Sequence, residues 1–122
     1  MVYGTLNQIK RRLAIPTSNV VYDTEITDSQ LTATREMDVD LSNQGVAVPL
    51  AGVSATISNY AGEVESDLAG AIMQEHKGES RPAEVLRARY KEGLMKLVKA
   101  LTGGVYVTKG GIMEKGLERR TS

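Results

Sequence analysis

Two stretches of the chain carry apolar residues at helical spacing, and they form its clearest pattern. The first lies at about 51–77, where the apolar residues share one side of a helical wheel: Val53, Ile57, Tyr60, Ala61, Val64, Leu68, Ala71 and Ile72. The opposite face is expected to carry Glu63, Glu65 and Ala69. The second lies at about 82–102, with Leu86, Tyr90, Leu94, Leu97, Val98 and Leu101. The short turn between them predicts an antiparallel helical hairpin.

Weaker patterns predict two helices before the hairpin. Thr5 and Gln8 have the spacing of a capping box, which predicts a helix at about 5–15. Its solvent side is expected to carry Lys10, Arg11 and Arg12. The same spacing at Thr27 and Gln30 predicts a second helix that stops before Gly45. Its apolar residues scatter around the helix, so we expect it to contact a neighbouring subunit as well as the core: Leu31, Met37, Val39 and Leu41.

The pattern changes after Gly104. Residues 105–108 favour an extended conformation, and no apolar stripe follows them. We therefore predict a mainly α protein, a small helical bundle built on a long antiparallel helical hairpin with an extended C-terminal arm. The helical domain is expected at 1–104 and the arm at 105–122.

Composition narrows the class of protein. A chain of 122 residues fits one domain, and with 41% hydrophobic residues but no Phe or Trp its core must be mainly aliphatic. No apolar run approaches the ~20 residues that span a bilayer, and the first residues lack a signal-peptide pattern, so we expect a cytoplasmic, membrane-free protein. The absence of cysteine excludes disulfides and thiolate metal sites.

The net charge is zero, but the charges are unevenly placed. Residues 1–79 contain 5 Lys/Arg and 11 Asp/Glu, whereas residues 80–122 contain 10 and 4. Two interpretations remain open: solvated helix faces of opposite charge, or attraction between the acidic part of one copy and the basic part of the next around a ring.

The sequence offers little catalytic chemistry. His76 is the only histidine and has no expected partner, while Asp38 and Asp40, two residues apart, are expected on a solvated helix face. Neither glycine pair, at 103–104 or 110–111, has the spacing of a phosphate-binding loop. We therefore expect no enzyme activity, no catalytic or metal-binding residues and no cofactor.

The order of segments resembles a known family. A short opening helix, an acidic helix, a Val-Pro-Leu connector, a long Ala/Gly-containing helix and a final helix running into Gly-Gly follow one another. The stretch 82–104 carries the resemblance, with Ala83-Glu84-Val85, Arg89-Tyr90-Lys91-Glu92 and Leu97 before the glycines. Over about residues 3–108 the chain resembles the head–tail adaptor, or connector, family of long-tailed phages and related archaeal viruses.

This resemblance implies a structural protein of the virion neck, assembled in the host cytoplasm. It implies a ring of identical subunits, expected to be dodecameric, which docks on the portal protein, extends the DNA channel and supports the next neck or stopper protein. The C-terminal arm would contact the portal through Val105, Tyr106, Val107, Ile112, Met113, Leu117, Arg119 and Arg120. The subunit interface is expected to involve Arg35, Asp38, Asp40, Arg87 and Lys91.

An alternative is a nucleic-acid-binding helical protein, either a packaging subunit or a regulator. It would use the basic helix at 82–102, through Arg87, Arg89, Lys91, Lys96 and Lys99. These side chains are expected to spread around the helix, and the one aromatic residue there, Tyr90, lies on the apolar stripe. The pattern therefore favours phosphate contacts over sequence reading.

Overall fold

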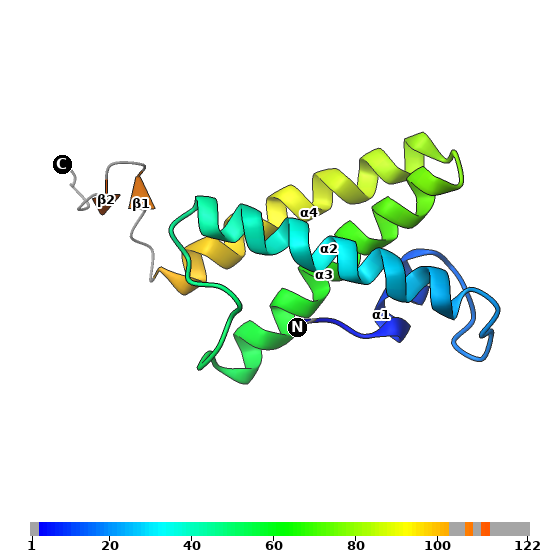
Figure 1. Ribbon diagram of the computed structural model, residues 1–122, viewed down its shortest axis with the longest axis horizontal. Coiled ribbons are helices and arrows are strands. Elements are labelled where there is room, and N and C mark those ends of the chain that lie inside the picture. Colours follow the sequence, from blue (N-terminus) through cyan, green and yellow to red (C-terminus); the bar gives the residue numbers. More distant parts are fainter. Residues whose placement is uncertain (1–2, 103–106, 109–110, 113–122) are drawn as a thin grey trace.

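The computed structural model describes residues 3–102, 107–108 and 111–112, and in these residues the chain is mainly helical (Figure 1). The helices are α1 (Leu6–Arg12), α2 (Asp23–Asn43), α3 (Ala55–His76) and α4 (Ser80–Leu101). Two very short strands, β1 (Val107–Thr108) and β2 (Gly111–Ile112), pair antiparallel, with Val107 opposite Ile112. The small helical bundle predicted from the sequence is confirmed.

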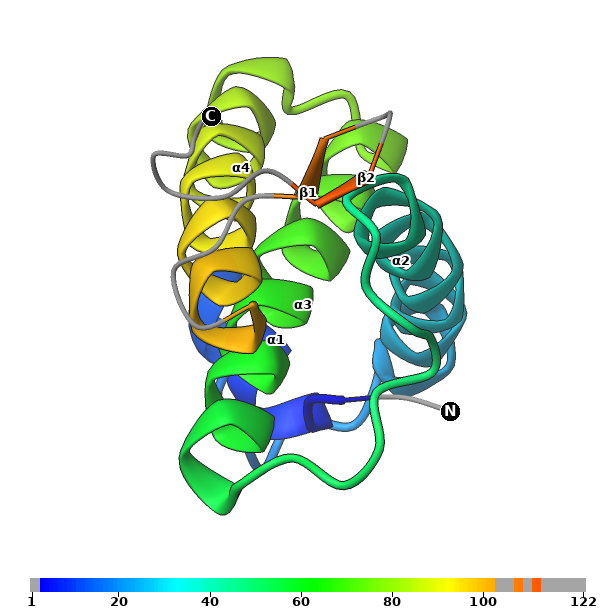
Figure 2. The same ribbon diagram turned by 90° about the vertical axis from the view of Figure 1, so that its left-hand side faces the viewer.

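Helix α3 lies at the centre of the bundle. It forms an antiparallel hairpin with α4, while α1 and α2 cover its other sides (Figures 1 and 2). All residues from Val64 to Gln74 are buried. The prediction of an exposed face with Glu65 and Ala69 was therefore wrong, because neither residue has exposed surface. A single apolar stripe on α3 underestimates its burial, since α1 and α2 pack on the more polar side.

The core is built from aliphatic side chains, as the composition predicts. Each helix contributes side chains with no exposed surface: Ile9 from α1, Ile26, Met37 and Leu41 from α2, Leu68 from α3 and Leu97 from α4. Burying such a side chain stabilises the fold by about 1.5–3 kcal/mol. The connector before α3 joins this core through Leu50, which is 5% exposed.

Glycines allow the elements around α3 to approach closely. A Cβ on Gly62 would lie 2.7 Å from the Tyr3 carbonyl oxygen, so the N-terminal segment crosses α3 at backbone contact. Farther along, a Cβ on Gly70 would lie 3.0 Å from Leu86 Cδ1 of α4. The predicted role of small residues on this helix, close packing, is confirmed.

Helix boundaries differ from the predicted ones at two places. Helix α2 begins at Asp23, four residues before the capping pattern at Thr27. The earlier turn is stabilised because Ile26 is fully buried and because Asp23 and Glu25 lie near the positive end of the helix dipole. Helix α1 ends at Arg12, where Ala14 adopts φ +57° and the Ile15 N–H donates to the Lys10 carbonyl at 2.9 Å.

Candidate functional site

The predicted portal-binding arm lies mostly outside the described residues. Within them, Val107 and Ile112 face each other in the β1–β2 pair, so two of the predicted arm residues are brought together by main-chain pairing. The others fall outside the described part of the chain: Val105, Tyr106, Met113, Leu117, Arg119 and Arg120. The role of the arm stays a prediction.

Two of the predicted subunit-interface residues hold tyrosines inside the subunit. The Tyr3 hydroxyl donates to Asp38 Oδ1 at 2.6 Å, and the Tyr90 hydroxyl donates to Asp40 Oδ2 at 2.6 Å. Burial, reinforced by the bond to Asp38, raises the pKa of Tyr3 to about 12. Burial and the bond to Asp40 raise the pKa of Tyr90 still further. The carboxylates expected on a solvated face are therefore half-buried acceptors that join α2 to the N-terminal segment and to α4.

A third predicted interface residue, Arg87, links three helices of the same subunit. Its Nε lies 2.5 Å from Glu75 Oε2 of α3, and its Nη1 lies 3.1 Å from Glu36 Oε2 of α2. Hydrogen bonding to Glu75 raises the pKa of Arg87, and the same bond lowers the pKa of Glu75. Arg35 and Lys91, in contrast, are exposed on the outer sides of α2 and α4. These two are the predicted interface residues that face outward.

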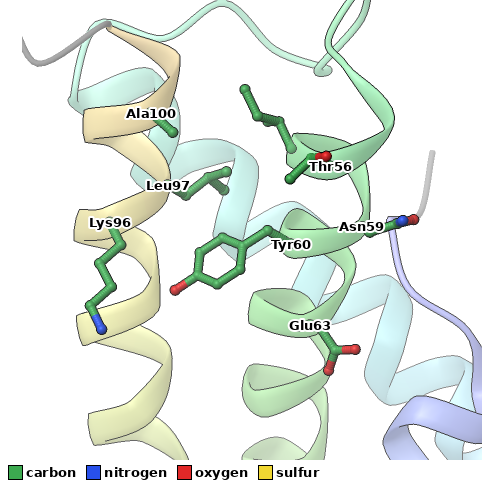
Figure 3. Close-up of a pocket in the computed structure, with 8 residues that line it drawn as sticks. Thr56, Asn59, Tyr60, Glu63, Lys96, Leu97 and Ala100 are labelled. Atoms are coloured by element: carbon green, nitrogen blue, oxygen red, sulfur yellow. The ribbon is translucent and has the colours of Figure 1, made fainter.

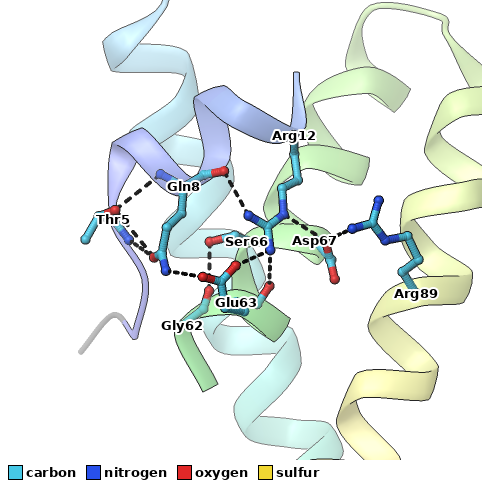
Figure 4. A network of polar contacts seen from close by, with 8 residues as sticks. All are labelled: Thr5, Gln8, Arg12, Gly62, Glu63, Ser66, Asp67 and Arg89. Atoms are coloured by element: carbon cyan, nitrogen blue, oxygen red, sulfur yellow. Dashed lines mark hydrogen bonds and ion pairs between the residues drawn. The ribbon is translucent and has the colours of Figure 1, made fainter. Parts of the chain in front are cut away.

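Helix α1 is fixed to α3 by a polar network (Figure 4). The Thr5–Gln8 capping box is present, and the Gln8 amide extends to Glu63 Oε2 at 2.9 Å. Arg12 pairs with Glu63 and, at 2.9 Å, with Asp67. The prediction that all three basic residues of α1 face solvent was thus wrong for Arg12. It was wrong for Lys10 too, which is 3% exposed and pairs with Asp23 at 2.9 Å.

Glu65 is a buried carboxylate that ties the N-terminal segment to the bundle. It accepts hydrogen bonds from the backbone N–H groups of Tyr3 and Gly4, the latter at 2.9 Å. Gln30 Nε2 donates to it at 3.2 Å and Thr34 Oγ1 at 2.7 Å. All these donors are neutral, and together they satisfy a charge that would otherwise be costly to bury. The sequence pattern gave no sign of this cluster, because its donors lie far away along the chain.

An open apolar groove separates the start of α3 from the end of α4 (Figure 3). Its volume is about 580 Å³. Tyr60 extends from α3 toward α4, and Leu97 points back from α4. A Cβ on Gly93 would lie 3.6 Å from the Tyr60 hydroxyl, so the missing side chain leaves room for the ring. The rim carries Thr56, Asn59, Lys96 and Ala100.

Several large apolar side chains remain exposed on the described surface. Leu31 and Val39 lie on α2 at 43% and 59% exposure, and Val85 and Met95 lie on α4. The most exposed are adjacent residues of the α1–α2 loop, Val20 at 66% and Val21 at 77%. Sequence reasoning missed this pair, because it treated the loop as polar and assigned no role to it.

The basic residues of α4 do not gather into one face. Arg87 is engaged by two carboxylates, Arg89 lies 3.9 Å from Asp67, and Lys96 lies 3.8 Å from Glu92. Lys91 is exposed on another side of the helix. This distribution gives no continuous track for a phosphate backbone.

Catalytic chemistry gains no support from the described residues. His76 is exposed at the last turn of α3, and the described part of the chain contains no group of three acidic or histidine side chains placed to hold a metal ion. Among the same residues no helix has both the length and the apolarity needed to cross a bilayer.

Comparison of the chain with protein family models, curated proteins and solved structures gives no match. The surfaces described above are therefore the basis for a functional proposal.

Proposed function

We propose that this protein is a ring-forming adaptor of a tailed virus, which docks on the portal and joins the head to the neck. One observation carries the proposal: the polar groups of the bundle are largely consumed by bonds within the subunit, while apolar side chains remain exposed at several of its surfaces. Such surfaces are typical of proteins that act by contact with other proteins. The order of segments, which resembles that of the adaptor family, supports the same function.

The mechanism is multivalent docking by identical copies. The helical bundle provides a rigid body, and residues 105–122 of each copy provide the contact with the portal. Val107 already takes part in main-chain pairing with Ile112, and β-strand addition to an exposed sheet edge would extend that pairing to a partner. Because several arms engage one symmetric portal, weak single contacts sum to tight binding.

Deletion of residues 105–122 tests the role of the arm. The truncated chain is expected to keep the helical circular-dichroism spectrum, because the core side chains lie in α1 to α4 and their connections. Its binding to the portal ring of the same virus, measured by sedimentation of the complex, is expected to be lost. A matched substitution, Lys91→Ala on the exposed side of α4, should leave the binding by the arm intact. Portal binding of the truncated chain at full affinity would contradict the proposal.

A titration with duplex DNA at several salt concentrations separates the proposal from nucleic-acid recognition. The adaptor is expected to bind duplex DNA weakly, with affinity that falls steeply as salt rises. Tight, sequence-selective binding would favour the alternative instead.

A further inference from the structure

We propose that the exposed Val20–Val21 pair of one copy inserts into the apolar groove between α3 and α4 of the next copy. The inference rests on the proposed ring function and names the contact that builds the ring. Val20 and Val21 together form the valine knob, and the cavity lined by Ile57, Tyr60, Lys96, Leu97 and Ala100 is the end groove.

The valine knob is a prominent apolar feature held in a fixed position. Both side chains are more than half exposed, at 66% and 77%. The loop before them is tied down by Lys10 Nζ, which donates to the Thr17 carbonyl at 3.2 Å, and by Asn19 Oδ1, which accepts from the Val21 N–H at 3.0 Å. On the other side the Lys77 ammonium lies 3.9 Å from the centre of the Tyr22 ring. A loop fixed in this way loses little entropy on binding.

The end groove matches the knob in chemistry. It is apolar in its interior, where Ile57 and Tyr60 face Leu97, and its volume of about 580 Å³ accommodates two valine side chains and part of their backbone. Neither surface has a partner within the described part of the subunit.

The charges beside the two surfaces are opposite. Glu25 and Asp28, both exposed, follow the knob in the first turns of α2. Lys96 lies on the rim of the groove and is 66% exposed, and its pairing with Glu92 spans 3.8 Å between exposed side chains. Such a pair contributes little, so Lys96 is available to an acidic neighbour. This arrangement gives a structural form to the charge asymmetry between residues 1–79 and 80–122.

The placement of the two surfaces suits a ring. The α1–α2 loop lies at one end of the long axis of the bundle, and the start of α3 and the end of α4 lie toward the other end (Figure 1). Contact between two different patches is heterologous, and it closes into a ring when each copy is rotated by a constant small angle, about 30° for twelve copies. The same geometry excludes insertion of the knob into the groove of its own subunit.

Disulfide trapping in the full chain tests the contact, because the sequence contains no cysteine. The double variant Val21→Cys/Ala100→Cys is oxidised mildly and run on a denaturing, non-reducing gel. A ladder of covalent oligomers beyond the dimer is expected, since each copy has one donor and one acceptor surface. Single variants should stop at dimers. The control pair Val21→Cys/Ser42→Cys, whose second site is exposed on α2 away from the groove, is expected to form the ladder at least tenfold more slowly.

A second substitution tests the apolar nature of the contact. Adding Val20→Asp to the double-cysteine variant should lower the rate of ladder formation at least tenfold, whereas Leu31→Asp, also at an exposed apolar site, should not. Equal rates in the control pair, or no effect of Val20→Asp, would overturn the inference. So would a rapid intramolecular disulfide in Leu117→Cys/Ala100→Cys, because the chain's own terminal segment would then occupy the groove.

Binding to the portal, measured separately, distinguishes the two proposals. A fixed-stoichiometry portal complex without the Val21–Ala100 ladder would refute the knob-in-groove contact and leave the adaptor function standing. A ladder from a protein that does not bind the portal would support the contact and refute the adaptor function.

Discussion

Glu65 is the residue on which the arrangement of the N-terminal segment most depends. It has no exposed surface, and its carboxylate accepts bonds from Tyr3, Gly4, Gln30 and Thr34. These donors belong to the N-terminal segment and to α2, so one side chain of α3 joins three parts of the chain. The arrangement requires an acceptor at both oxygens.

Glu65→Gln is therefore expected to destabilise the fold by about 2–3 kcal/mol, because the amide nitrogen would face a donor and leave it unsatisfied. Urea unfolding at neutral pH measures the effect. Glu84→Gln, at an exposed position of α4, is the matched control and should change stability by less than about 0.5 kcal/mol. A loss as small as the control's would contradict the role of Glu65.

Ala14 is the only described residue other than glycine with positive φ, at +57°. Because L-alanine adopts this conformation at a cost, Ala14→Gly is expected to stabilise the protein by about 0.5–1 kcal/mol. The same substitution within a helix, Ala88→Gly at an exposed site of α4, should destabilise by about 1 kcal/mol. Thermal unfolding of the two variants should thus shift in opposite directions, and a destabilised Ala14→Gly would contradict this expectation.

At the level of elements, Arg87 joins α4 to Glu75 of α3 and to Glu36 of α2. The pKa of Glu75 is lowered in the fold, so its pairing stabilises the protein above the carboxyl's unfolded pKa and is lost as pH falls through the folded value. The side chains are about one-third exposed, so solvent screening keeps the contribution small.

Arg87→Met is accordingly expected to cost no more than about 1 kcal/mol at neutral pH. The difference from the unmodified protein should shrink at about pH 3, where Glu75 is largely protonated. Urea unfolding at both pH values measures it, with Lys91→Met as the exposed control. A difference that stays constant or grows on acidification would show that packing, and not the ion pair, is responsible.

The elements show how far the sequence predicts the fold. The stripe from Leu86 to Leu101 predicted α4 and its packing on α3 correctly, because an amphipathic helix with one buried face carries its contacts in its own spacing. Helix α3 is surrounded, so its second buried face, with Glu65 and Ala69, depends on partners from distant segments. The same limit explains why Lys10 and Arg12 were expected in solvent.

The candidate surfaces could be predicted less well than the fold. Asp38, Asp40 and Arg87 were assigned to a subunit interface on charge alone, but the structure gives each a partner within the subunit. Charge patterning cannot distinguish an internal partner from one on another copy. The end groove and the valine knob depend on tertiary exposure, which no local spacing reveals.

At the level of the whole molecule, we propose a rigid helical body that acts through repeated contacts with larger partners. Exposed apolar side chains at both ends of the bundle, opposite charges beside them and the terminal residues 105–122 would together give each copy two neighbours and one portal contact. A weak contact between free copies is consistent with assembly on the portal, where the effective concentration of neighbouring copies is high.

The most direct test is native mass measurement of the full chain, alone and mixed with the portal ring of the same virus. We predict a monomer in dilute solution and, in the mixture, one large complex with a fixed number of chains per portal, expected to be twelve. A mixture in which the portal and the monomer keep their separate masses would contradict the adaptor function.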